Sequence, residues 1–432
     1  MFGDPVNNLW VIVAGLLVFT MTIAVGLLEV GELGEALYAS LMKTVLMTCL
    51  ALFVMAIVGF NTAFAPTIGG GVIGNPFYRP GLFLGSFAAS PATAPGTVWW
   101  SMAPAGFNTG LDTGTYFLFE TAFAAVTLAL VGVVVLRKMK LVALGAYSIV
   151  YFVLIWNLPA AWIWNPTGWL AKLGMVDFAG GLVVHGAAGA AGLGLLYQFW
   201  REERAKGLTA SPQATIQVSP GWLTLAILLL WVGWFGFNPG SVLAFNDETT
   251  VVVLTTFLAA ASAMLSVLAF RHILHVEAPT LLDGTNGILM GLIVITPVAG
   301  FVSPASAIVL GILGGPIFLL GEKYFAKWKW MSDPVGLLPG HLVGGLFGVA
   351  MIAFFAEPAY SGALPGYPGL PSLPAGLLFG GGTPALHQLG IEMFGVVAVM
   401  VTVFVLSFVT AWVLARLLGG ITTDYRKEGI LP

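Results

Sequence analysis

Eleven apolar stretches, most of them about twenty residues long, constrain this chain more than any other feature. They lie at residues 8–28, 39–63, 115–136, 141–160, 177–198, 217–241, 249–270, 281–300, 304–321, 335–356 and 390–418. A helix needs about 20 mainly apolar residues to cross the hydrocarbon core of a membrane. Only 8% of the 432 residues are charged, which leaves too little polar surface for a water-soluble protein of this length. The sequence therefore predicts an all-α polytopic membrane protein with eleven transmembrane helices.

Basic residues are distributed unevenly between the loops. If the N-terminus lies outside, only Arg79 and Lys172 of the 16 Lys and Arg residues fall on the outer side. Loops rich in Lys and Arg stay on the cytoplasmic side, so we expect a multi-pass protein of the cell membrane (inner or plasma membrane), with its N-terminus outside and its C-terminus in the cytoplasm. No basic segment precedes the first apolar stretch, which indicates a retained span and not a cleaved signal peptide.

A pattern of one Asp, one His and two Gly occurs twice, in the fifth and the tenth apolar stretch. The two copies are Asp177, His185, Gly189, Gly192 and Asp333, His341, Gly345, Gly348. Spans five and ten run in opposite directions, so the pattern indicates two inverted five-helix repeats plus one extra helix. We expect one transmembrane domain over 1–418, with repeats at about 8–198 and 217–356 and the extra helix at about 390–418, and a short tail over 419–432.

Helix geometry places both histidines deep in the membrane. Eight residues of helix rise about 12 Å, close to half of the hydrocarbon thickness of roughly 30 Å. His185 and His341, approached from opposite sides, are therefore expected to meet near the midplane and to form a polar thread through an apolar pore. For Asp177 we favour a helix cap with electrostatic influence over a direct cation ligand, and Asp333 is its counterpart.

Three sequence motifs resemble signatures of the ammonium transporter family (Amt/Mep/Rh), and of its Amt branch in particular. They are DFAGGLVVH at 177–185, WFGFNPGS at 234–241 and TPVAGFVS at 296–303. The resemblance implies a homotrimer in the lipid bilayer, in which each subunit has its own narrow pore. It also implies an outer aromatic site that recruits ammonium, a gate of two stacked Phe rings and a pair of pore histidines.

The resemblance assigns these roles to particular residues. The gate falls to Phe123 and Phe237, and the pore pair to His185 and His341. The outer substrate site falls to Ser241, Trp234, Phe119 and Phe152. No cofactor or nucleic-acid partner is implied, and an enzyme is not expected, because no nucleotide-binding loop, thiol pair or nucleophile elbow occurs.

Several positions depart from the family pattern. The span-four region that usually supplies an outer Trp reads Tyr151-Phe152, the second Asp of span ten is Gly336, and Glu120 replaces the usual Gln. An unpaired charge inside a span is costly, so we expect Glu120 to be protonated or paired. It either tunes cation attraction near the gate or is hydrogen-bonded to a neighbouring helix. Glu32 and Glu35 occupy an inner turn that is usually rich in Gly and basic residues.

We expect transport of ammonium or ammonia, in which an ion recruited outside loses a proton before the dry constriction. Desolvating an ion is expensive, and cation–π contacts of about 0.5–2 kcal/mol offset part of that cost. The proton travels along the His pair or by a separate water wire. The alternatives are an ammonium sensor without transport and an Rh-like gas channel. The outer segments 64–112 and 357–389 form either a vestibule wall or plain loops.

The short tail offers few groups for regulation. The charges available for docking are Asp424, Arg426, Lys427 and Glu428. Exposed ion pairs contribute roughly 0–1 kcal/mol each. We therefore expect binding of the nitrogen-signalling PII proteins to be weak or absent.

Overall fold

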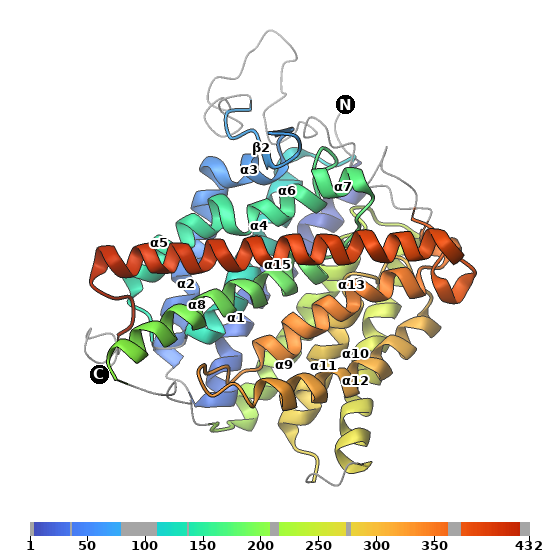
Figure 1. Cartoon of the computed structure of the whole chain (residues 1–432). Helices are drawn as coiled ribbons and strands as arrows, with labels where there is room; N and C mark the ends of the chain where they lie inside the picture. The colour runs from blue at the N-terminus through green and yellow to red at the C-terminus, as the bar shows by residue number, and fades with distance from the viewer. Residues whose placement is uncertain are drawn as a thin grey trace.

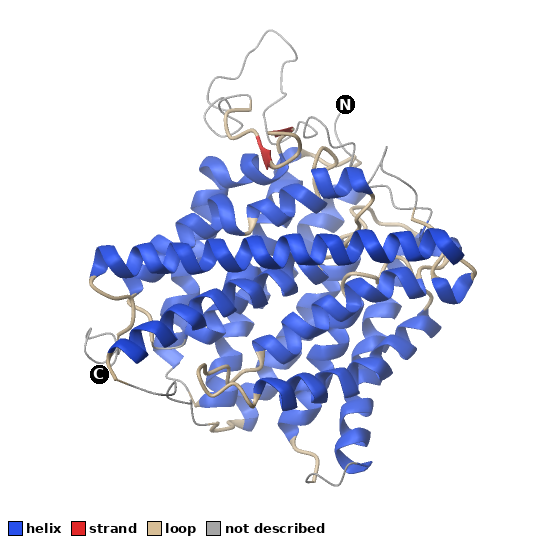
Figure 2. Cartoon of the chain, in the orientation of Figure 1, coloured by secondary structure: helices blue, strands red, loops and turns tan. Residues whose placement is uncertain are grey.

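The chain folds into a bundle of helices (Figures 1 and 2). The computed structural model describes residues 4–34, 37–78, 110–135, 138–207, 216–273, 278–361 and 373–423. Within these ranges the strands are limited to one short antiparallel pair, β1 (Thr67–Ile68) and β2 (Ile73–Gly74), at one end of the bundle. The all-α architecture predicted from the sequence is confirmed.

Among the described residues, ten helical segments are long and apolar enough to cross a membrane, and α11, with 15 residues, is a shorter apolar helix. The first five are α1 (Pro5–Leu33), α2 (Leu37–Val54) continued through η1 (Met55–Gly59) and α3 (Phe60–Phe64), α4 (Thr113–Val135), α5 (Leu141–Val150) continued through η3 (Tyr151–Ile155) and α6 (Asn157–Ile163), and η4 (Gly181–Gly186) continued by α8 (Ala187–Ala205). The other six are α9 (Pro220–Gly240), α10 (Asp247–Ile273), α11 (Leu281–Ile295), α12 (Pro304–Phe325), η5 (Leu337–Leu342) continued by α13 (Val343–Phe355), and α15 (Gly382–Leu418). Short helices α7 (Trp169–Leu173), α14 (Pro358–Ser361) and η6 (Leu377–Phe379) lie in the connections.

Local chemistry fixes several helix ends. Asp4 accepts the backbone N–H groups of Val6 and Asn7 and so caps the start of α1, and Gly34, in the left-handed conformation, follows its last residue. Thr280 and Asp283 form a reciprocal capping box at the start of α11. These caps satisfy backbone groups that a helix end leaves open.

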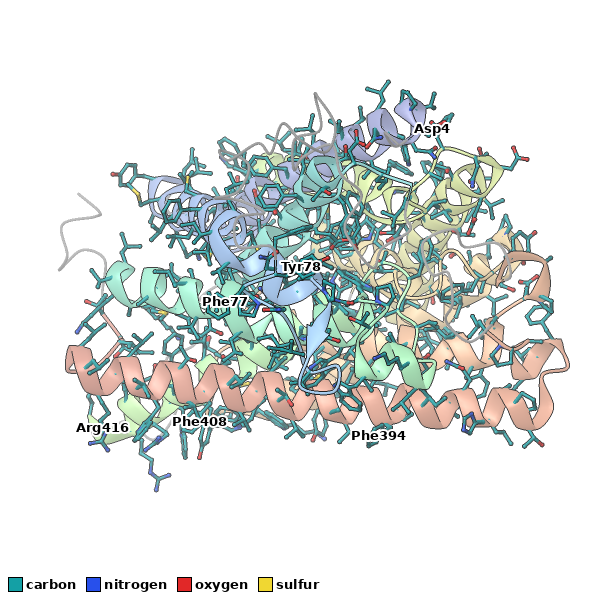
Figure 3. All side chains as sticks on the ribbon, turned by 90° about the horizontal axis from the view of Figure 1, so that it is seen from above. Asp4, Phe77, Tyr78, Phe394, Phe408 and Arg416 are labelled. Carbon is teal, nitrogen blue, oxygen red and sulfur yellow. The ribbon has the colours of Figure 1, made fainter. Side chains whose placement is uncertain are left out.

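Because successive spans alternate in direction, the bundle has two ends. We call the end where α1 begins the N face and the end where α15 ends the C face. Helix α15 runs across the bundle over α8 and α13 (Figure 1). Seen from above, it forms one edge of the molecule, with Phe394, Phe408 and Arg416 spaced along it and Asp4 near the opposite edge (Figure 3). Exposed apolar side chains on α15, such as Phe394 and Val401, fit a lipid-facing surface.

The two Asp–His copies have the same local structure, which supports their origin in a repeat. A glycine with positive φ, Gly180 (φ 108°) or Gly336 (φ 77°), precedes a π-helical segment that carries the histidine. The left-handed conformation favours glycine. Gly180 and Gly336 therefore adopt this conformation without the strain that a side chain would add. The bounds expected for the two repeats stay a prediction.

The start of the tail is docked more firmly than its charges suggested. Thr422 pairs with Met139 in an antiparallel bridge, and the Glu202 carboxylate accepts the backbone N–H groups of Ile421 and Thr422 at 3.0 Å each and the Thr422 hydroxyl at 2.6 Å. Ile421 is fully buried. The sequence analysis considered only the charges beyond residue 423, whereas at residues 421–423 backbone groups, the Glu202 carboxylate and the Lys206 ammonium group make the contact.

Some expectations fall on parts of the chain that the structure does not describe. Residues 79–109, which are most of the first long connection, and residues 362–372, which are part of the second, lie outside the described residues. Glu35 and the tail from Asp424 onward also lie outside them. The vestibule wall and the roles of the tail charges stay predictions.

Candidate functional site: a narrow pore with two histidines

His185 and His341 meet in the interior of the bundle. Their Nδ1 atoms are 3.1 Å apart, and the side chains are 1% and 8% exposed. When both imidazoles are neutral, one Nδ1 donates its proton to the other. The Nε2 atom of His185 has no partner among the described residues. The pair is therefore a polar link with free hydrogen-bonding capacity in a buried place.

Glycines at equivalent places let the two histidine segments cross closely. A side chain at Gly189 would meet Leu342, with Cβ atoms 2.7 Å apart, and a side chain at Gly345 would collide with the Gly181 carbonyl oxygen. Because Gly189 faces the second copy and Gly345 faces the first, the contact is reciprocal. The spacing from each His to its glycine thus determines how near the imidazoles lie.

Asp177 and Asp333 hold the beginnings of these segments. The Asp177 carboxylate accepts four backbone N–H groups, those of residues 180–183, at 2.7–3.1 Å. Asp333 accepts those of Leu337 and Leu338 at 2.9 and 2.8 Å. Asp333 precedes the membrane-spanning segment, and burial raises its pKa to about 6 although backbone N–H groups oppose the shift. The geometry of both carboxylates is that of a helix cap, the interpretation favoured for Asp177.

A column of rings leads from the N face to the histidines. The ring centroids of Phe123 and Phe237 are 4.3 Å apart, and the Phe237 ring stacks on His185 at 5.8 Å with an interplanar angle of 10°. Both Phe side chains are almost fully buried. The structure thus brings together the two Phe residues and the two His residues that the sequence assigned to one pore.

Trp234 lies at the histidines and not at an outer vestibule. Its ring stacks on His185 at 5.5 Å, and its Nε1–H donates to the Thr296 hydroxyl at 3.0 Å. The side chain is 1% exposed. The vestibule position expected for Trp234 is therefore wrong, because α9 directs this ring inward beneath Phe237.

Phe119 and Ser241 lie on the N-face side of the two Phe rings. The Phe119 ring is 4.8 Å from Phe123 and packs on Gly240. Ser241 follows Phe237 by one helical turn and donates its hydroxyl to the Phe237 carbonyl oxygen at 2.8 Å. Both residues therefore occupy the side from which an outer substrate would reach the rings.

Glu120 is buried beside this aromatic group. It is hydrogen-bonded to Tyr116 on its own helix, and its Oε2 has no partner among the described residues. The bond to Tyr116 lies within α4, and Oε2 makes no bond to another helix in the described residues, so the expected hydrogen bond to a neighbouring helix is not found. The tuning role stays a prediction.

Trp164 is the residue that the sequence analysis missed. Its ring contacts Phe123 edge to face at 5.6 Å, whereas Phe152 is fully buried and packs on Tyr151. Span four was expected to end at residue 160, but α6 continues to Ile163 and delivers Trp164 to the rings. Trp164, and not Phe152, is therefore the span-four residue whose ring packs against the gate rings. The tryptophan-rich run WIW at 162–164 is the signal that would have found it.

A narrow cavity continues from the rings toward the C face. The residues that line it come from α1, α4, α9, α11 and the two histidine segments: Met21, Val25, Leu28, Val126, Leu130, His185, Leu230, Trp234, Phe237, Leu289 and His341. Apart from the imidazoles and the indole N–H, the lining is apolar. The described residues contain no cluster of His, Cys, Asp and Glu that would hold a metal ion. Such a passage suits a small molecule that crosses without most of its water.

The fold and this passage define a polytopic membrane transport protein. The model of the Ammonium Transporter Family matches residues 9–430, so the chain belongs to that family, a family of transporters and not of enzymes.

Known proteins match nearly the whole chain, one in sequence and two in fold. The chain is 30% identical to an ammonium transporter of Aquifex aeolicus over 421 residues, which cover 96% of this chain and 89% of the relative. A solved structure described as a sensor Amt protein has a TM-score of 0.79 at 26% identity, and the match covers 98% of this chain and 96% of that one. Mep2 of Saccharomyces cerevisiae has a TM-score of 0.78 at 24% identity, with 96% and 86% covered, which shows a shared fold.

Proposed function

We propose that the chain carries ammonium across the cell membrane, with recruitment of the ion at an outer site, loss of a proton and passage through the pore lined by His185 and His341. The N face is the outer side, and the C-terminus is cytoplasmic. Three subunits form a homotrimer in which each subunit has its own pore. The observation that carries the proposal is the 3.1 Å contact between the two Nδ1 atoms at the end of the ring column.

Recruitment takes place at the aromatic group on the N face. Phe119, Phe123 and Trp164 present ring faces and edges within one small region, and Ser241 adds a hydroxyl. Aromatic rings attract a cation by about 0.5–2 kcal/mol each. Their combined attraction offsets part of the cost of removing water from ammonium.

Deprotonation follows because the next part of the path is closed and dry. The rings of Phe123 and Phe237 touch, and the cavity beyond them offers the imidazoles as its polar groups. Neutral ammonia has one lone pair and three N–H groups, so it can hydrogen-bond to an imidazole nitrogen that donates and to one that accepts. The proton moves through the His pair or by a separate water wire.

The test is flux through the purified protein in proteoliposomes, with ammonium supplied outside. Current and a change in luminal pH on addition of ammonium are the expected result. Binding without flux would identify a sensor, and electrically silent flux would identify a gas channel. Either of these results would contradict the proposed mechanism.

A further inference from the structure

Glu32 is a buried carboxyl group for which the pore described so far has no use. It lies near the end of α1, is 2% exposed, and its Oε1 has no hydrogen-bond partner in the described part of the chain. Keeping an unsatisfied polar group in the interior costs free energy. A ligand with hydrogen-bond donors would recover that cost.

The helix periodicity places Glu32 at the C-face end of the cavity. Met21, Val25 and Leu28 line the cavity from α1. Residues three and four apart share one face of a helix, and Glu32 follows Leu28 by four residues, about one turn. Glu32 therefore continues the lining stripe of α1 beyond the histidines toward the C face.

Glu29, on the same helix, is a buried carboxylate whose oxygens have hydrogen-bond partners. Glu29 accepts Lys43 at 2.7 and 2.8 Å and the Ser40 hydroxyl at 3.0 Å, and Lys43 also donates to the Gly132 carbonyl oxygen. Lys43, the buried cation of α2, thus pairs with Glu29 and not with Glu32. Glu32 receives no such neutralisation from it.

Within the described residues, α4 and α9, which also pack on α1, carry no Lys, Arg or His. Helix α9 has no titratable side chain over residues 220–240, and Tyr116 and Glu120 of α4 lie toward the N face. Among the described residues, the Asp333 carboxyl at the start of the His341 segment acts electrostatically on Glu32. Glu32, which has an open carboxyl oxygen, therefore lies at the C-face end of the cavity with a second carboxyl group acting on it.

We propose that Glu32 binds ammonium at the C-face end of the pore, with Asp333 adding negative charge, so that the pore has a cation site at each end. This inference rests on the proposed function. Ammonium donates an N–H to Oε1 of Glu32, a charge-assisted hydrogen bond. The N-face site uses rings and a hydroxyl, whereas the C-face site uses a carboxylate, so the two ends differ in affinity and in salt dependence.

The test measures ammonium flux separately from each face, in oriented proteoliposomes that contain the full chain. Glu32→Gln keeps the size of the side chain and removes the carboxyl group. We expect the half-saturating ammonium concentration for flux from the C face to rise about tenfold or more, the effect of losing a hydrogen bond to a charged group. The value measured from the N face should stay within about twofold.

A matched control is Glu392→Gln. Glu392 is also a buried carboxyl with one unpartnered oxygen, but it lies on α15 and bonds to the Val176 N–H and to Gln388, away from the cavity lining. We expect this change to leave the affinity at both faces unaltered. An equal loss of affinity from both faces in Glu32→Gln, or no loss from either, would overturn the proposal.

Infrared difference spectra give a readout that needs no flux. Addition of ammonium chloride should perturb a carboxylate band in the wild-type protein and in Glu392→Gln, and the band should be missing in Glu32→Gln. A persistent band in Glu32→Gln refutes the Glu32 site even if transport is intact, whereas a band without flux refutes transport alone. If Glu32→Gln does not fold, Glu32→Asp, which keeps the charge on a shorter side chain, should shift the band, and an unshifted band would overturn the proposal.

Discussion

The indole Nε1–H of Trp164 donates a 2.7 Å hydrogen bond to the backbone carbonyl oxygen of Asp177. The same ring contacts Phe123 edge to face. A residue of the N-face aromatic group is thereby tied to the residue whose carboxylate caps the His185 segment. The recruitment site and the pore helix are joined through one side chain.

Replacing Trp164 with Leu removes one ring from the proposed recruitment site. Since a cation–π contact is worth about 0.5–2 kcal/mol, the half-saturating ammonium concentration from the N face should rise roughly twofold to thirtyfold. Trp162→Leu is the control, because Trp162 contacts Trp169 and bonds to Val72 instead of touching the gate rings. Equal affinities in the two variants would contradict the role given to Trp164.

Lys43 and Glu29 form a buried ion pair that links α1, α2 and α4. Lys43→Met leaves the Glu29 carboxylate buried without its cation, and such a change typically costs 3–5 kcal/mol. A large fall in thermal unfolding temperature is therefore expected. The double variant Glu29→Leu with Lys43→Met should recover most of the loss. A single variant as stable as the wild type would refute this account.

The pKa of Asp333 is raised to about 6, so the folded protein binds this proton more tightly than the unfolded chain does. The stabilising contribution is complete below the unfolded pKa of about 3.9 and is lost as pH rises through about 6. The free energy of unfolding of the wild type should therefore fall between about pH 4 and pH 6, and the Asp333→Asn variant should lack this part of the fall. Thermal unfolding of both proteins from pH 4 to 7 checks this, and parallel curves would contradict it.

Glu202 is expected to hold the beginning of the tail. Glu202→Ala removes the acceptor for Ile421 and Thr422, so hydrogen exchange at these two amides should become faster. Glu322→Ala is the control, because Glu322 lies at the same face and pairs with Arg271. Unchanged protection in Glu202→Ala would show that the bridge to Met139 suffices alone.

Much of the fold was predictable from the sequence, because a membrane limits a span to one kind of structure. The apolar stretches predicted the ten long apolar helices and the shorter α11 of the described residues, and the two Asp–His patterns predicted that His185 and His341 meet. These features depend on local composition and on spacing along one helix. Both are visible in a single sequence.

Other features depended on where helices end and which way their side chains turn. Trp164 was missed because α6 extends a few residues beyond the apolar stretch, and Trp234 was placed outside because the direction of its ring is set by packing in α9. In the sequence, Glu29 and Lys43 are two isolated charges in or next to separate apolar stretches, and nothing indicates that they form a pair. Tertiary contacts of this kind have no local pattern to reveal them.

The central claim is that ammonium crosses through a pore whose selectivity depends on the paired imidazoles of His185 and His341. The direct measurement is ammonium-selective flux, recorded as current and luminal pH change, in proteoliposomes that contain the wild type, His185→Ala, His341→Ala or both changes together. We predict that each single change abolishes the flux or its selectivity for ammonium over potassium, while the protein remains folded. Full ammonium-selective flux in the double variant would contradict the account.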